Sequence, residues 1–303
     1  MIVAGKGGVG KTTVTAALAI SAAQLDHEVL VAEVAGQSRL PPLLGRSISV
    51  APGDEQRLTP EISAMTIDPE AALVEWAGQL IRPRALLDIA VGSNSFSGFI
   101  NAAPGGRELL TITKAAELSR ADRWDDQAPR YQPVILDAPA SGHALAMLRT
   151  PTTFAEIARV GPIANQARSV QTLLADPDRC SIILVTTLEE TPVNETLELE
   201  IALTNQLGRG VDLIVANGLS SDGLSDLEVS ELSGAVPPVA APIAKAIERV
   251  HQREGLQREQ LERLLRFVEA PVIELPAITE HAIGPDEIDS LAAALSTALA
   301  NVS

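Results

Sequence analysis

Gly5-Lys6-Gly7-Gly8-Val9-Gly10-Lys11-Thr12-Thr13 is the stretch that decides the fold of this 303-residue chain. It fits the P-loop pattern G-x-x-x-x-G-K-[ST]. The backbone N–H groups of such a loop wrap a phosphate chain, and that curvature requires residues without a Cβ. The Lys11 ammonium is expected against the β- and γ-phosphates, and the Thr12 hydroxyl on Mg²⁺. The predicted nucleotide-binding residues of the loop are Gly5, Gly7, Gly8, Val9, Gly10, Lys11, Thr12 and Thr13.

The sequence on both sides of the loop supports this interpretation. Residues 1–4 are an apolar run typical of a short strand, and residues 11–23 are an Ala- and Leu-rich stretch typical of a helix. That helix would point the positive end of its dipole at the phosphates. A glycine-rich turn with a chance lysine is the alternative, and the order of strand, loop and helix disfavours it.

The composition excludes several kinds of partner and site. Hydrophobic residues make up 46% of the chain and aromatic residues only 2%, so a core of Ala, Leu, Ile and Val is expected. A net charge of −16 opposes binding to nucleic acids and acidic lipids, and Arg82, Arg84 and Lys114 are interpreted as ordinary surface charge. The single cysteine, Cys180, excludes an internal disulfide and a cysteine-based zinc site. The chain has no apolar stretch for stable membrane insertion, and it runs straight into the P-loop strand without room for a signal peptide ahead of that strand, so a cytoplasmic location is expected.

Alternating apolar strands and amphipathic helices predict an α/β fold with a doubly wound, mostly parallel sheet. We expect a single domain over residues 1–303. The helices of residues 69–126 and 144–176 are expected as a helical insertion over the carboxyl edge of that sheet. The other predicted strands are residues 29–34, 64–67, 134–137, 181–185, 211–216 and 272–275, and further helices are predicted at residues 243–267 and 285–300.

One of these strands ends in an acid. Val134-Ile135-Leu136-Asp137 is an apolar run followed by a carboxylate, which is the Walker B arrangement. The carboxylate would orient a Mg²⁺-bound water close to the Thr12 hydroxyl. A strand that ends in Asp is common, so the signal gains its weight from the residues around it. The predicted metal ligands are Thr12 and Asp137.

Several further segments carry a family resemblance. A second lysine, Lys6, follows the first glycine of the loop. Asp137-Ala138-Pro139-Ala140-Ser141-Gly142-His143 follows the acidic strand, and Glu189-Glu190-Thr191-Pro192-Val193 and Asn217 follow the next two strands. Together they resemble the ArsA-like P-loop ATPases, which include the arsenite-pump and tail-anchored-protein-targeting ATPases, in a bacterial branch with one P-loop. The resemblance covers most of the chain.

The resemblance implies ATP and Mg²⁺ as cofactors and a P-loop NTPase fold. It implies that Lys6 reaches across to the nucleotide of a partner, in a homodimer or in a heterodimer with a paralogous ATPase. It also implies that Asn217 reads adenine, and Pro276 is expected to open the loop on the adenine side. The alternatives are a solvated loop lysine at position 6 and a turn-forming asparagine at position 217.

Three departures from the family bear on function. Where switch I of the family reads S-T-D-P-A-H, this chain has Glu33-Val34-Ala35-Gly36-Gln37-Ser38, so the water-positioning Asp falls on Ala35. Glu33, two residues earlier, is the substitute catalytic candidate beside Lys6, Lys11 and Asp137, although a buried partner for a helix is its alternative role. One cysteine cannot hold arsenite, and three methionines without a Cys-x-x-Cys support a client groove poorly.

Two functions stay open. The first is a dimeric ATP-driven switch that hydrolyses ATP slowly and couples it to a client or partner protein. The second is a regulatory subunit that binds nucleotide without hydrolysing it, as one half of a heterodimer. A membrane- or DNA-positioning ATPase is disfavoured, because residues 281–303 contain no Lys or Arg to make a basic amphipathic anchor.

Overall fold

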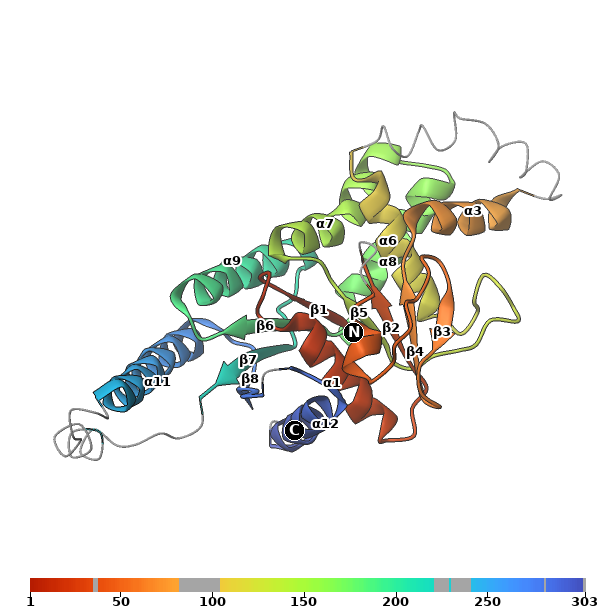
Figure 1. Cartoon of the computed structure of the whole chain (residues 1–303). Coiled ribbons are helices and arrows are strands. Elements are labelled where there is room, and N and C mark those ends of the chain that lie inside the picture. The colour runs from red at the N-terminus through yellow and green to blue at the C-terminus, as the bar shows by residue number, and fades with distance from the viewer. Residues whose placement is uncertain (35–37, 82–103, 221–228, 230–240, 281, 302–303) are drawn as a thin grey trace.

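One twisted sheet organises the molecule (Figure 1). The computed structural model describes all residues except 35–37, 82–103, 221–228, 230–240, 281 and 302–303. The strand order is β3-β4-β2-β5-β1-β6-β7-β8, and every pairing is parallel except that of the edge strand β3 with β4. The predicted α/β class with a mostly parallel sheet is therefore confirmed. The strands are β1 Ile2–Gly5, β2 Val29–Glu33, β3 Glu55–Arg57, β4 Ile62–Thr66, β5 Val134–Asp137, β6 Ile182–Thr187, β7 Leu213–Leu219 and β8 Val272–Pro276.

Helices cover both faces of the sheet, because strand residues are apolar on both sides. In β1, Ile2 and Ala4 pack toward α6, α7, α8 and α9, whereas Val3 between them packs toward α1 and α12. The alternation repeats along the central strands, so the sheet divides two hydrophobic cores. The helices are α1 Lys11–Ala23, α2 Leu40–Leu43, α3 Pro69–Leu80, α6 Gly106–Leu118, α7 Ser141–Ala158, α8 Pro162–Ala175, α9 Glu190–Leu207, α11 Ala241–Phe267 and α12 Pro285–Ala300.

Some predicted boundaries are wrong. The helix expected to run to about residue 126 ends at Leu118. The reason is the Glu117 carboxylate, which accepts hydrogen bonds from the Arg123 side chain at 2.7 Å and the Trp124 backbone N–H at 3.0 Å, and so folds the following residues back onto the helix end. Pro276 is the last residue of β8 and not the start of a loop. No helix within the described part of the chain is long and apolar enough to span a membrane.

A cluster of charged side chains joins the helices above the sheet to the edge strand β3. Glu117 and Arg123 are almost fully buried, and Arg123 pairs with both Glu117 and Glu55. Lys114, which is 4% exposed, bonds the Glu117 carboxylate at 2.8 Å and lies 5.5 Å from the centre of the Trp124 ring. Lys114 is therefore a core residue, and its interpretation as surface charge is wrong. Arg82 and Arg84 lie outside the described residues.

Arg123→Met is expected to lower the free energy of unfolding by about 3–5 kcal/mol, because it leaves the Glu117 and Glu55 carboxylates without their shared counter-charge. The matched control is Arg120→Met, three residues earlier, which removes an exposed pair with Asp122 and should cost no more than about 1 kcal/mol. Urea unfolding of both variants measures the difference. Equal losses would mean that the buried cluster contributes no more than a surface ion pair.

Candidate functional site

The P-loop lies between the end of β1 and the start of α1. At two of its glycines, a side chain would overlap neighbouring atoms. Gly5 has φ +148°, and a Cβ there would overlap the carbonyl oxygen of Val185 on the neighbouring strand β6. Gly10 has φ +91°, and a Cβ there would overlap the side-chain amide of Asn217. The loop is therefore packed against the backbone of β6 and a side chain of β7, and both positions need glycine.

Lys11 begins α1 and turns its side chain back over the loop. Its Nζ donates a hydrogen bond of 2.9 Å to the carbonyl oxygen of Lys6. Burial lowers the pKa of Lys11, and the Asp137 carboxylate opposes that shift. A single neutral carbonyl is a weaker partner for an ammonium than an anion would be, because charge-assisted hydrogen bonds are the stronger ones.

Thr12 and Asp137 meet although 125 residues separate them. The Thr12 hydroxyl donates a hydrogen bond of 2.6 Å to Asp137 Oδ2. Asp137 Oδ1 is buried without a hydrogen-bond partner among the described residues, and burial raises the pKa of this carboxyl. A hydroxyl beside an incompletely bonded carboxylate is an oxygen donor set that suits Mg²⁺, which takes one or two protein ligands and completes its shell with phosphate and water. The predicted metal residues therefore fit the ion.

Glu33 at the end of β2 is 2% exposed and serves a helix. Its Oε1 accepts hydrogen bonds from the backbone N–H groups of Arg39 at 2.6 Å and Leu40 at 3.2 Å, at the start of α2. Its Oε2 has no hydrogen-bond partner among the described residues. Burial is the largest cause that raises the pKa of Glu33, to about 7. One carboxylate oxygen is thus structural, and the other remains available. Ala35 and Gln37 lie outside the described residues.

A cavity of about 650 Å³ opens between the P-loop, β2 and β5. It brings together most of the predicted phosphate and metal residues with one residue that sequence reasoning missed, Arg39. Arg39 precedes a short Leu-Pro-Pro-Leu segment, and no sequence motif there indicated a binding site. Gly5, Lys6, Val9, Asn217 and Pro276 do not line the cavity. The lining residues are Gly7, Gly8, Gly10, Lys11, Thr12, Thr13, Glu33, Val34, Arg39, Leu43, Asp137, Ala138, Pro139 and Ala140.

Lys6 does not line the phosphate cavity. Its Nζ forms an ion pair with Glu195 in α9, and the other oxygen of that carboxylate accepts a hydrogen bond of 3.1 Å from the Ser141 hydroxyl at the start of α7. The side chains of Lys6 and Glu195 are about one-third exposed, at 30% and 33%. The second lysine of the loop is therefore neither in the phosphate cavity nor a freely solvated residue in this structure.

The two residues predicted beside adenine lie on neighbouring strands. The Asn217 side chain donates a hydrogen bond of 2.9 Å to the carbonyl oxygen of Val9 and so supports the P-loop from β7. Pro276 ends the adjacent strand β8, where it is in register with Leu219. Both lie on the side of β1 opposite to β5 and β2. An adenine ring at these residues would place the base and the phosphate cavity on opposite sides of the loop.

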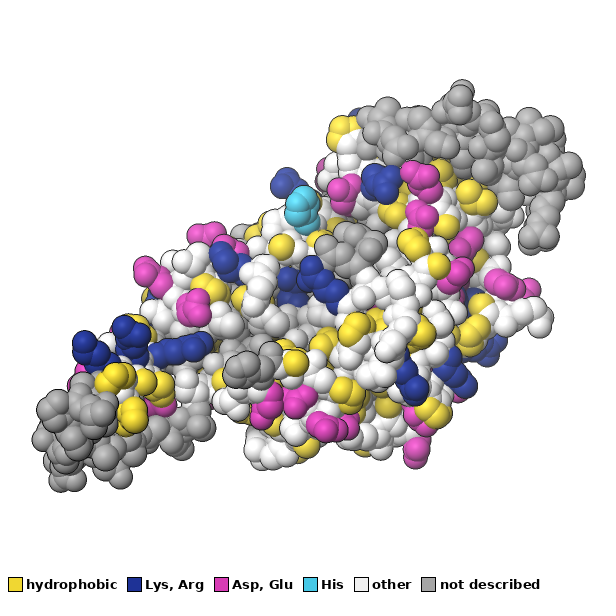
Figure 2. Space-filling view, in the orientation of Figure 1, with side chains coloured by type: hydrophobic (Ala, Val, Ile, Leu, Met, Phe, Trp, Pro, Cys, Tyr) yellow, Lys and Arg dark blue, Asp and Glu magenta, His cyan; other side chains and the backbone are white. Residues whose placement is uncertain are grey.

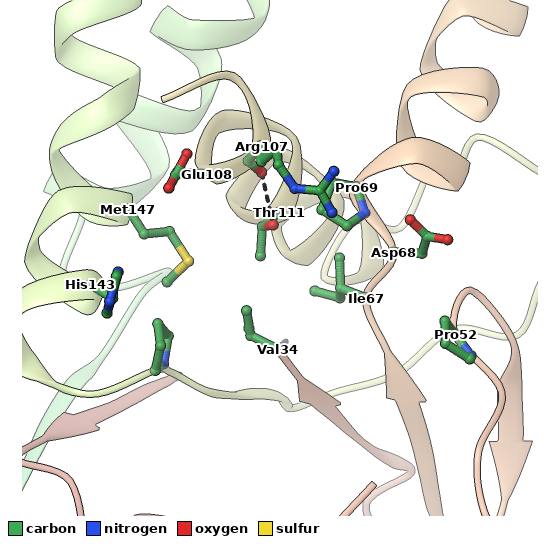
Figure 3. A pocket seen from close by; sticks show the side chains of 11 residues that line it. Val34, Pro52, Ile67, Asp68, Pro69, Arg107, Glu108, Thr111, His143 and Met147 are labelled. Atoms are coloured by element: carbon green, nitrogen blue, oxygen red, sulfur yellow. Dashed lines mark hydrogen bonds between the residues drawn. The ribbon is translucent and has the colours of Figure 1, made fainter. Parts of the chain in front are cut away.

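A second cavity, of about 560 Å³, lies above the sheet between α3, α6 and α7 (Figure 3). His143 and Met147 of α7 line one wall, and Thr111 of α6 faces them. His143 therefore lies at this cavity and does not line the phosphate cavity. Val34 and Pro139 line both cavities, so the residues that follow β2 and β5 form a shared wall.

The described surface carries a group of basic side chains along α11. Lys and Arg side chains gather over α11, at the lower left of Figure 2. The exposed basic residues of this helix include Lys245, Arg249, Arg253 and Arg258. Acidic residues of the same helix, such as Glu248 and Glu259, alternate with them along the sequence. This mixed charge is typical of a solvated helix face and gives no sign of a nucleic-acid site.

Comparison with known proteins gives a consistent result. A family model described as anion-transporting ATPase matches residues 1–163. ATPase BagA of Mycobacterium tuberculosis is 34% identical over 208 residues, which are 65% of this chain and 58% of that protein. ATPase GET3 of Kluyveromyces lactis is 30% identical over 186 residues, 54% of this chain and 51% of that protein. A putative arsenical pump-driving ATPase of Halobacterium salinarum is 23% identical over 301 residues, which are 94% of this chain but 42% of that protein. The matched regions thus span about half of these relatives.

Glu33→Gln is expected to flatten the pH dependence of stability. The folded pKa of Glu33 is about 7, above its ordinary value of 4.5, so the folded state holds this proton more tightly than the unfolded state. The resulting stabilisation is fully present below the unfolded pKa and is lost as the pH rises through the folded pKa. Between about pH 5 and pH 8 the wild type should lose about 2–3 kcal/mol through this group, and glutamine should not.

Urea unfolding at both pH values, in EDTA and without nucleotide, measures this effect. Asp137, whose pKa is also raised, is present in both proteins and contributes to both. Glu61→Gln, an exposed carboxyl just before β4, serves as the control and should keep the wild-type pH dependence. A Glu33→Gln variant that also keeps it would show that Glu33 titrates near its ordinary value.

Proposed function

The chain belongs to the anion-transporting ATPase family, and from that premise we propose that it is a nucleotide-driven dimeric switch that binds ATP at the P-loop and hydrolyses it slowly. The observation that carries the proposal is the hydrogen bond between Thr12 and Asp137, which joins the P-loop helix to the end of β5, where both residues line a cavity of about 650 Å³. The two residues are far apart in sequence, and their meeting there is what phosphoryl transfer on a P-loop requires.

In the proposed binding step, backbone N–H groups at the start of α1 receive the β-phosphate. The Lys11 ammonium leaves the carbonyl of Lys6 for oxygens of the β- and γ-phosphates. Thr12 and Asp137 would hold Mg²⁺, which neutralises charge that develops on the phosphates. The Thr12 hydroxyl would keep donating its hydrogen bond to Asp137 while its oxygen serves as a ligand, and Asp137 Oδ1, which has no partner among the described residues, would be a further oxygen donor.

The attacking water needs a polar group beyond the γ-phosphate. Glu33 lines the cavity and its Oε2 has no described hydrogen-bond partner, so Glu33 is our candidate for that task. Because Oε1 is held by the start of α2, the side chain has little freedom to follow a water. We therefore propose slow turnover, in agreement with alanine at position 35.

The alternative is a nucleotide-binding regulatory subunit that does not hydrolyse ATP. The commitment of Glu33 to α2 favours it, whereas the intact Lys11, Thr12 and Asp137 favour a working ATPase. In either case the partner is a second copy of this chain or a paralogous ATPase. A protein client, and a cytoplasmic location, remain part of the proposal.

Lys11→Ala is expected to raise the Kd for ATP by about 100-fold or more, because it removes charge-assisted hydrogen bonds to two phosphates. Isothermal titration with Mg²⁺-ATP and steady-state phosphate release measure binding and turnover, and Lys245→Ala, on the exposed side of α11, is the control. Turnover that disappears in Lys11→Ala supports the switch, and ATP binding without turnover supports the regulatory subunit. A wild type that binds no ATP contradicts both.

Glu195→Gln is expected to favour ATP-dependent dimerisation. In the proposed dimer Lys6 must leave Glu195 to reach the nucleotide of the partner. An ion pair whose side chains are about one-third exposed contributes about 0.5–1 kcal/mol, so its removal should lower the dimer Kd about two- to five-fold. Analytical ultracentrifugation with ATP measures the change, and Glu190→Gln, at the exposed first residue of α9, is the matched control. The double variant Lys6→Ala with Glu195→Gln should lose the gain, and keeping it would show that Lys6 has no part in the dimer.

A further inference from the structure

We propose that Arg39 binds the terminal phosphate of a nucleoside triphosphate, and that this contact makes the site prefer triphosphates to diphosphates. The inference deepens the proposed function and rests on it. Nothing in the motif pattern of the sequence marks this arginine. The argument comes from its place in the cavity, from the charges around it and from the anchoring of its backbone.

With the base on the Asn217 side of the P-loop, the order of strands gives the direction of the phosphate chain. The P-loop follows β1, the Thr12–Asp137 pair lies at the end of β5, and Arg39 lies after β2, the next strand along the sheet. Because β7, with Asn217 under the loop, lies on the opposite side of β1, a nucleotide that enters there has its terminal phosphate toward β5 and β2. Arg39 therefore lies at the end of the cavity where a triphosphate and a diphosphate differ.

A terminal phosphate at the β2 end of the cavity would need a cation to bind it. Among the described residues that line it, the cations are Lys11 and Arg39, and the acids are Glu33 and Asp137. Lys11 lies over the P-loop, where in the proposed function it would bind the β-phosphate and one edge of the γ-phosphate. Lys6 is not available in the same protomer, because it is paired with Glu195 outside the cavity.

Arg39 is anchored at its backbone and open at its side chain. Its N–H donates a 2.6 Å hydrogen bond to Glu33 Oε1, which fixes the residue at the rim of the cavity. Its side chain is exposed, and the guanidinium forms no ion pair with any described residue. Its charge nevertheless reaches the site, because it lowers the pKa of Lys11 and opposes the rise of the Asp137 pKa that burial causes.

An arginine suits this position chemically. The guanidinium has five donors in a planar fork that matches two oxygens of a phosphate, and it stays charged at every physiological pH. A lysine would supply the charge without the bidentate geometry. The same group could instead serve only as a counter-charge for Glu33 and Asp137, and then it would support every bound nucleotide alike. The two roles therefore predict different effects of an Arg39 substitution on the affinities for ATP and ADP.

The test compares Arg39→Gln, Arg39→Lys and Arg46→Gln, where Arg46 is an exposed arginine just beyond α2. Titration calorimetry with Mg²⁺ gives the Kd of each protein for ADP and for a non-hydrolysable ATP analogue. Arg39→Gln should bind the analogue about 10- to 100-fold more weakly and ADP within about two-fold of wild type. Arg39→Lys should lie between, and Arg46→Gln should match the wild type for both ligands.

Two results would overturn the proposal. If Arg39→Gln weakens both nucleotides by the same factor, or neither, Arg39 does not contact the terminal phosphate, while nucleotide binding by the wild type leaves the proposed function standing. If the wild type binds neither nucleotide, the proposed function fails and this inference with it. Thermal unfolding without nucleotide should be the same for Arg39→Gln and Arg46→Gln, which separates loss of a contact from loss of the fold.

Discussion

The hydrogen bond between Thr12 and Asp137 is the contact on which the arrangement of the site depends. It joins the first turn of α1 to the end of β5, and these elements neighbour each other only because β1 pairs with β5 in parallel, with Val3 opposite Asp137. The same register places Asp137 opposite Glu33 of β2. A shift of one residue in either pairing would turn one of these carboxylates to the other face of the sheet. The site is thus a product of strand register as much as of the P-loop itself.

Two of the residues that line the phosphate cavity also line the second cavity, above the sheet. Val34 and Pro139 follow β2 and β5, and each lines both the phosphate cavity and the cavity beneath α3, α6 and α7. A movement of either residue would change the shape of both cavities, because each residue lines both. The helices above the sheet can therefore respond to the phosphate cavity through two short backbone segments, without a change in the sheet.

The sequence predicted the parts of the molecule whose signals are local. The P-loop, the buried strands and α12 each carry their pattern within a few neighbouring residues. The end of α6 was mispredicted because the carboxylate of Glu117 makes its deciding contacts with Arg123 and Trp124 in the segment beyond the helix. The pairing of Lys6 with Glu195 spans 189 residues, and the role of Glu33 toward α2 depends on how the chain turns after β2. Such contacts follow from tertiary structure, and no periodicity in the sequence encodes them.

The position of the two tryptophans has a consequence for spectroscopy. Trp76 lies in α3, and Trp124 lies beside Lys114 in the buried charge cluster, both above the sheet and away from the residues that line the phosphate cavity. The chain has no other tryptophan and a single tyrosine, so its intrinsic fluorescence comes almost wholly from this region. Tryptophan emission should therefore report on the environment of the helices that cover the sheet, and not directly on bound phosphates. A change in emission when nucleotide is added would show that binding at the phosphate cavity alters the helices above the sheet.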